Sequence, residues 1–177
     1  MDHLQIFACI FLIIFTLVAS IDGFYFHLYK YKLYTRKESI YEHFLHTLNS
    51  FFFPFTIVLL FIFNVSGILL WLSIILTLIT LVIEFVDVFE EKKSRENIGG
   101  LSSLEYAMHF SMSGLRATYT TIILAGKPLA AWTLSKGNLS LVHYPLPLAI
   151  IGTSVAVLGV PVFILHYYLW RNFEKNR

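Results

Sequence analysis

Charge and cysteine are both scarce in this sequence. Lys, Arg, Asp and Glu make up only 14% of the 177 residues, whereas soluble domains carry about 25%. The formal net charge is +2, too small for the basic surface of a nucleic-acid-binding protein. Cys9 is the one cysteine, so an internal disulfide and a cysteine-based metal site are both excluded. The composition excludes a soluble globular enzyme, a secreted disulfide scaffold and a nucleic-acid binder.

Apolar residues occur instead, and they are gathered in long blocks. Hydrophobic residues make up 57% of the chain, and the mean hydropathy is +0.71. A transmembrane helix needs about 20 such residues. Five blocks predict spans at about residues 4–26, 45–63, 65–86, 104–125 and 148–170. We therefore expect an all-α fold, an integral membrane five-helix bundle that forms a single domain over residues 1–177, with an outer loop at 126–147.

Local patterns agree with these boundaries. The first block has no preceding Lys or Arg and is longer than the apolar region of a signal peptide, so we interpret it as a retained span. Thr35 with Glu38, and Ser102 with Glu105, match the Ser/Thr-x-x-Glu capping box, which predicts the starts of the second and fourth helices.

The distribution of Lys and Arg predicts the orientation. Ten lie at one side of the proposed membrane and two at the other. The ten are Lys30, Lys32, Arg36, Lys37, Lys92, Lys93, Arg95, Arg171, Lys175 and Arg177, and the two are Lys127 and Lys136. The positive-inside rule then places the N-terminus outside and the C-terminus in the cytoplasm. We expect a plasma-membrane protein of the bacterial inner-membrane type, with the lipid bilayer as its main partner.

Every predicted span carries His or carboxylate residues near its cytoplasmic end. Ionisable groups at membrane depth are costly and usually face the bundle interior, where they pair with one another. The members of this layer are Asp22, His27, Glu42, His43, His46, Glu84, Asp87, Glu105, His109 and His166. This layer is the main clue to function in the sequence.

A repeated pattern within the layer indicates metal binding. Ser-x-x-Glu-x-x-x-His occurs at Ser39, Glu42 and His46, and again at Ser102, Glu105 and His109. Residues four apart share one helix face, so each Glu and His could bind one ion. The two helices could also be related by a two-fold axis along the membrane normal. The ligand types resemble those of di-iron carboxylate bundles, although the spacing differs.

We therefore predict one or two divalent transition-metal ions at this boundary. The candidate ligands are Glu42, His46, Glu84, Asp87, Glu105, His109, His43, His27 and His166. Glu84 and Asp87 would bridge or complete the site, and His43, His27 and His166 would be further ligands or supports. Asp22 and Arg116 are predicted to form ion pairs with the ligand side chains without binding the metal themselves. Imidazole and carboxylate ligands without thiolate suit iron, manganese or zinc.

The function predicted from this site is that of a membrane oxidoreductase or hydrolase acting on a lipid or quinone. Four other interpretations stay open, one of which is a proton or metal-ion transporter. The polar layer could consist only of solvated helix ends. It could dock a partner membrane subunit in a non-catalytic accessory protein. Paired imidazoles, such as His43 or His46 facing His109 or His166, could bind a b-type haem in a quinone-reactive subunit.

One short motif indicates a different kind of enzyme. Glu90-Glu91-x-x-x-Arg95 resembles the first motif of the membrane CAAX-type proteases, and the resemblance implies paired glutamates that activate water. Residues 92–94 (Lys-Lys-Ser) predict a solvated loop instead, and His109 follows at a spacing that departs from the family pattern.

Overall fold

The computed structural model describes residues 3–134 and 142–176, and within them the fold is all-α. The long helices are α1 (His3–Ser20), α2 (Ile40–Ile57), α3 (Ile68–Arg95), α4 (Ser103–Ala125) and α5 (Leu146–Lys175). Two π-helical segments, Ile21–Lys30 and Val58–Ile62, extend α1 and α2. Short 3-10 helices lie at Leu33–Thr35, Lys37–Ser39, Glu96–Ile98 and Leu129–Trp132.

Four helical stretches in the described residues are long and apolar enough to cross a membrane. They are His3–Thr35, Lys37–Ile62, Ile68–Ile98 and Leu146–Lys175. The fifth predicted span, α4, forms a helix over the expected residues but is less apolar, since it contains Glu105 and Arg116. Large apolar side chains cover much of the outer surface, as lipid contact requires.

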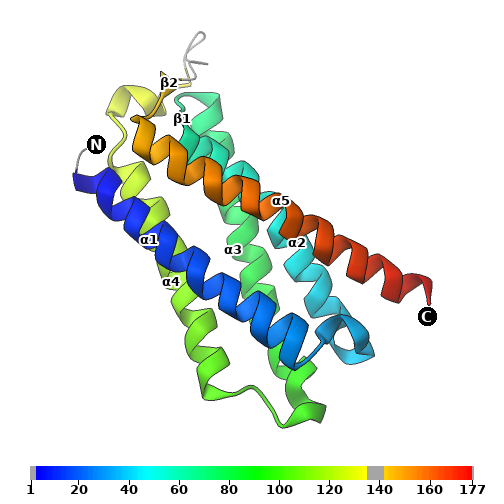
Figure 1. Ribbon diagram of the computed structural model, residues 1–177. Helices are drawn as coiled ribbons and strands as arrows, with labels where there is room; N and C mark the ends of the chain where they lie inside the picture. Colours follow the sequence, from blue (N-terminus) through cyan, green and yellow to red (C-terminus); the bar gives the residue numbers. More distant parts are fainter. Residues whose placement is uncertain (1–2, 135–141, 177) are drawn as a thin grey trace.

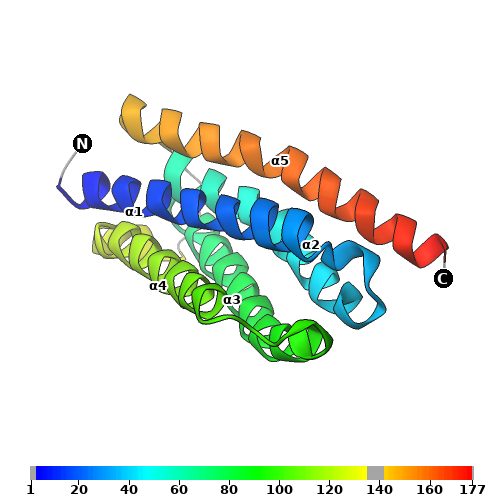
Figure 2. The same cartoon turned by 60° about the horizontal axis from the view of Figure 1, so that its bottom comes forward.

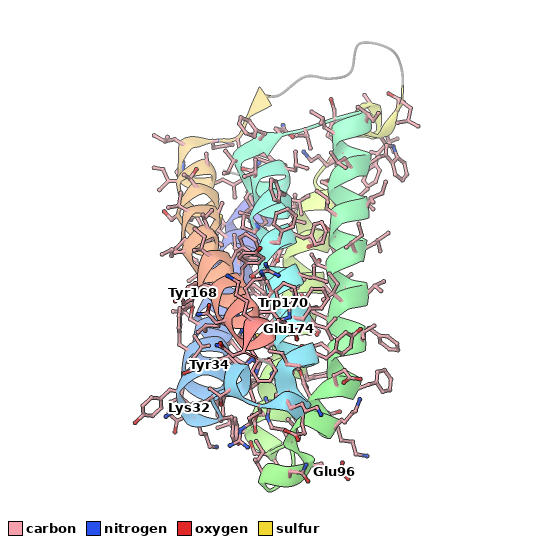
Figure 3. The ribbon with its side chains drawn as sticks, turned by 90° about the vertical axis from the view of Figure 1, so that its right-hand side faces the viewer. Lys32, Tyr34, Glu96, Tyr168, Trp170 and Glu174 are labelled. Carbon is pink, nitrogen blue, oxygen red and sulfur yellow. The ribbon has the colours of Figure 1, made fainter. Side chains whose placement is uncertain are left out.

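The helices pack side by side with the chain ends at opposite ends of the bundle (Figure 1). Helix α1 packs along α4, and α2 packs between α3 and α5 (Figure 2). A two-residue ladder between β1 (Phe63–Asn64) and β2 (Val142–His143) closes one end of the bundle. Figure 3 shows Lys32, Tyr34 and Glu96 at the other end. The predicted outer loop carries the 3-10 helix around Trp132 and β2, and its residues 135–141 lie outside the described part.

Two predicted boundaries are wrong. Helix α3 continues to Arg95 instead of ending near residue 86, so the segment interpreted as a solvated loop is helical. Thr35 does not cap α2, because its hydroxyl donates to the Lys32 carbonyl and the helix begins at Ile40. The second capping box is confirmed: Ser102 and Glu105 cap the start of α4 reciprocally.

Candidate metal centre

Nine side chains from four helices form a connected polar cluster inside the bundle. They are Asp22, His27, Glu42, His46, Asp87, Glu91, Arg95, Glu105 and His109, and we call them the polar cluster. All are buried except His46, which is partly exposed. Burial of so many ionisable groups requires that each find a partner.

Helix α3 supplies the central column of the cluster. Asp87, Glu91 and Arg95 are spaced four residues apart, so their side chains lie along one helix face. That face is buried, and it lies toward the other cluster helices. The position of Arg95 at the end of this series accounts for the extension of α3 beyond its predicted boundary.

The two copies of the Glu-x-x-x-His pattern meet on this column. His46 Nε2 lies 3.0 Å from Asp87 Oδ2, and His109 Nδ1 lies 2.6 Å from Glu91 Oε2. Each histidine therefore faces a different carboxylate of α3. The expectation that the second and fourth helices turn equivalent faces inward is consistent with this arrangement.

Both glutamates of the repeat bind the same guanidinium. Arg95 donates from Nη1 and Nη2 to Glu42, at 2.8 and 3.1 Å. Its Nε donates to Glu105 Oε1 at 3.0 Å. The other oxygen of Glu105 accepts from the Tyr31 hydroxyl and from Ser102. Arg95 thus joins α2, α3 and α4 through charge-assisted hydrogen bonds.

The N-terminal helix contributes Asp22 and His27. In a π-helix the hydrogen bonds run between residues five apart, a geometry that recurs at functional sites. The π-helical segment places these two side chains on one face, with His27 Nε2 3.3 Å from Asp22 Oδ2. The other carboxylate oxygen, Asp22 Oδ1, lies 3.1 Å from His109 Nε2. Asp22 therefore lies between two imidazoles.

Ligand-type atoms converge in two overlapping groups. The first group is Asp22, His27 and His109, and the second is His27, Glu42 and His46. In the second group, Glu42 Oε1 lies 3.8 Å from His27 Nε2 and 4.0 Å from His46 Nε2. Within each group the ligand atoms lie within 4.8 Å of one another.

Three of the imidazoles have at least one ring nitrogen without an aligned hydrogen bond. His27 is fully buried, yet neither of its ring nitrogens has a hydrogen-bond partner among the described residues. His46 Nε2 and His109 Nδ1 are close to carboxylates but are not aligned for hydrogen bonding. Buried polar atoms without partners are uncommon, so this site calls for a ligand or a proton.

Several predicted ligands lie elsewhere. Glu84 pairs with Arg116, with Oε1 3.0 Å from Nη2. His43 and His166 lie against each other, with ring centroids 4.8 Å apart, and His43 Nε2 is 3.2 Å from the carbonyl oxygen of His166. Glu105 is held by Arg95. These four side chains surround the two groups of ligand-type atoms but belong to neither.

The sequence interpretation gave too little weight to three residues. Asp22 was expected to be a charge partner, but it lies at the centre of the cluster. Glu91 was considered in the protease-like motif, and Arg95 was counted with the basic residues of the cytoplasmic side, but both are buried. The available signal was the four-residue spacing from Asp87 through Glu91 to Arg95, which marks one helix face.

No protein-family model, curated protein or solved structure matches this chain. Its function must therefore be argued from the polar cluster and its surroundings.

Proposed function

We propose that this chain is an integral membrane metalloprotein whose polar cluster binds two divalent transition-metal ions. We further propose that the site catalyses an oxidoreductase or hydrolase reaction on a lipid or a quinone. The observation that carries the proposal is His27, an imidazole that is fully buried among carboxylates with no hydrogen-bond partner in the described residues.

The spacing of the ligand-type atoms suits shared ions. Atoms bound about 2.1 Å from one metal lie roughly 3 Å apart when adjacent and roughly 4 Å apart when opposite. The contacts of His27 with Asp22 and Glu42 are 3.3 and 3.8 Å. Those of His46 with Asp87 and Glu42 are 3.0 and 4.0 Å. All four distances fall in the range for atoms that share an ion.

Asp22 is the proposed bridge between the two ions. Its Oδ2 faces His27 and its Oδ1 faces His109, so one carboxylate can serve both. Glu91 lies against the other nitrogen of His109. A metal-bound histidine commonly donates its second N–H to a carboxylate, which fixes the tautomer and the ring orientation. Glu91 would have that role.

The charge of the polar cluster also supports two ions. Five carboxylates accompany one guanidinium, which leaves four formal negative charges when the three imidazoles are neutral. Protonation of all three imidazoles would still leave one negative charge. Two divalent cations would compensate all four, in a region where uncompensated charge is costly.

The donor set indicates the kind of ion. Imidazole and carboxylate without thiolate favour iron, manganese or zinc. A redox-active ion would supply electron transfer or oxygen chemistry, and a zinc-like ion would lower the pKa of a bound water. The chain's own residues hold the site away from bulk water and set its geometry.

The packing of the imidazoles favours ions over haem. A bis-histidine haem needs one ring on each face of the macrocycle. Here the ring centroids of His27 and His46 are 4.3 Å apart, and those of His43 and His166 are 4.8 Å apart. The rings of His43 and His166, one of the pairs that could hold a haem, are thus too close to accept a macrocycle between them.

For the orientation, we propose the N-terminus outside and the C-terminus in the cytoplasm of a bacterial-type inner membrane. Because Arg95 belongs to the polar cluster, the Lys and Arg count that supports this orientation becomes nine against two. The bias remains strong by the positive-inside rule.

Metal analysis of two matched histidine variants tests the proposal. His27 and His3 lie on the same N-terminal helical segment, but His27 is buried in the polar cluster and His3 is exposed at the other end. Elemental analysis of the protein purified in detergent should give about two transition-metal ions per chain for the wild type and for His3→Ala.

In His27→Ala the metal content should fall by at least half, while the helical circular dichroism is retained. A wild-type protein that is folded but holds no transition metal would overturn the proposal. The cluster would then be a proton-charged network, and the accessory-protein interpretation would replace the metalloenzyme.

A further inference from the structure

A cavity of about 390 Å³ lies between the five helices and reaches the polar cluster. Its volume is in the range of ligand pockets, about 300–1,000 Å³. Asp22, His46, Asp87, Glu91 and His109 all line it. A molecule in this cavity would therefore contact five side chains of the polar cluster.

The remaining cavity wall is mainly apolar. Helix α5 contributes Val155, Leu158, Val162 and Leu165, and α1 contributes Phe15 among others. Polar side chains come from α1 and its π-helical extension, α2, α3 and α4, whereas α5 contributes mainly hydrocarbon, with His166 as its polar residue. This asymmetry suits a ligand with one long apolar part and one short polar part.

Helices α1 and α5 are neighbours on one face of the bundle (Figures 1 and 2), and both α5 and the π-helical extension of α1 contribute cavity-lining residues that are exposed. Phe24, Leu158 and Leu165 line the cavity and are also exposed on the outer surface. If the helices span a membrane as proposed, this surface meets lipid. The cavity would then admit molecules from the hydrocarbon layer.

Glycines pack α5 closely against α2 and its π-helical extension. A Cβ atom on Gly159 would lie 2.8 Å from the Pro54 ring, and one on Gly152 would lie 2.7 Å from Phe61 Cβ. Such close packing of α5 on α2 requires glycine.

The charges around the cavity select against an anionic head group. Carboxylates of the cluster and of Glu84 line it, and its Arg116 is already engaged by Glu84 and Asn49. With two divalent ions the cluster would be neutral, so an anionic ligand would add an uncompensated charge. A neutral hydroxyl or carbonyl group can instead accept a hydrogen bond from Arg116 Nε, which has no partner in the described residues.

We propose that the cavity binds the single hydrocarbon chain of an uncharged lipid, with its oxygen-bearing end against the polar cluster. This inference rests on the proposed function for the role of the cluster. The shared ligand chemistry is a neutral oxygen on a long chain, which both a long-chain alcohol and a quinone with an apolar tail provide.

Photo-crosslinking in lipid nanodiscs tests the inference. The probe is a sixteen-carbon alcohol with a diazirine on the chain, and adducts are mapped by mass spectrometry. We expect adducts on α1 and α5 residues that line the cavity. Unlabelled hexadecanol or a decyl quinone should compete with the probe for the cavity and reduce these adducts. Palmitate, which is anionic, should not reduce them. Adducts only on outer lipid-facing residues, or equal competition by palmitate, would overturn the inference.

Two glycine variants give a matched control. Gly23 lines the cavity and Gly114 does not, and a Cβ added at either meets no atom within 4 Å. Gly23→Leu should lower cavity adducts about tenfold, whereas Gly114→Leu should leave them unchanged. Equal labelling of the two variants would contradict the assignment of the cavity.

Metal analysis of the same samples separates the two proposals. Metal-loaded protein without cavity adducts would reject the lipid inference alone, and cavity adducts on metal-free protein would reject the proposed function alone. Gly23 is next to Asp22, so its substitution could also disturb the metal. If Gly23→Leu loses metal, the Val162→Phe variant can be used instead, because Val162 also lines the cavity and a larger side chain there would fill it. Cavity adducts at the wild-type level in Val162→Phe would overturn the inference.

Discussion

Asp22 and His27 lie five residues apart on one face of a π-helical segment, with Asp22 Oδ2 3.3 Å from His27 Nε2. In a regular α-helix, residues five apart point in different directions, since 3.6 residues make one turn. The local π geometry therefore brings both side chains into the polar cluster. The same carboxylate reaches His109 of α4 with its second oxygen.

The Asp22→Asn variant tests this bridging position. Asn keeps the size of the side chain but removes the negative charge, and one of its two ends becomes a donor. We expect at least one of two metal ions to be lost, measured by elemental analysis. Glu174→Gln removes a carboxylate from the exposed end of α5 and should keep the full metal content. Equal metal in the two variants would rule out Asp22 as a bridge.

Glu42 and Glu105 should respond differently to the same substitution. Both bind Arg95, but only Glu42 belongs to a group of ligand-type atoms. Glu42→Gln should lower metal content. Glu105→Gln should preserve metal, because Gln can still cap α4, but should destabilise the fold by about 1.5–3 kcal/mol through the lost charge-assisted bond. Metal loss in Glu105→Gln would instead make it a ligand, as the sequence pattern predicts.

Two further glycine substitutions test how α5 packs on α2. Gly152→Ala should destabilise the protein by about 1–3 kcal/mol, because the added methyl group would overlap Phe61. Gly114→Ala, at an exposed position with free space, should stabilise α4 by roughly 0.8–1 kcal/mol. Denaturation in detergent measures both changes. A neutral Gly152→Ala would show that the two helices can separate at little cost.

Lys127 should give stability a specific pH dependence. It is buried beside Asn64 and Val65, and burial lowers the pKa of Lys127 to about 8 from its usual 10.5. Between these values the unfolded chain binds more protons, so stability should rise with pH from about 8 to about 10.5. Below pH 8 the cost of burying the charge is fully present.

Thermal unfolding of wild type and Lys127→Met across this range isolates the contribution of Lys127. Their difference in Tm should shift in favour of wild type as pH increases. A difference that stays constant from pH 7 to pH 10.5 would show that Lys127 keeps its ordinary pKa.

The sequence was sufficient to predict the five long helices and the inward faces of α2 and α4, but not the start of α2 or the end of α3. Apolar length identified the blocks, and Glu and His four residues apart identified the shared face. The role of Asp22 could not be predicted in this way, because its alignment with His27 depends on π-helical hydrogen bonding. Arg95 was missed because the neighbouring lysines give the segment a loop-like composition, although the helix continues through it.

The sequence could not show which glutamate of the repeat is a candidate metal ligand and which one only supports the site. Glu42 and Glu105 occupy equivalent positions in the repeat, and both contact Arg95. Only the distances to His27 and His46 distinguish them. The distance to His27 depends on how the π-helical segment Ile21–Lys30 packs against α2, which no single helix pattern encodes.

The shared guanidinium of Arg95 has a consequence for biosynthesis. Helices α2 and α3 emerge from the ribosome before α4, so Arg95 can meet Glu42 early, but Glu105 must arrive later. Until then, Arg95 Nε lacks the carboxylate that it binds in the mature fold. Exposure of a partly paired cation to lipid is costly. If these helices span a membrane as proposed, insertion of α3 and α4 as a joined hairpin, with Arg95 and Glu105 already paired, would avoid that exposed state.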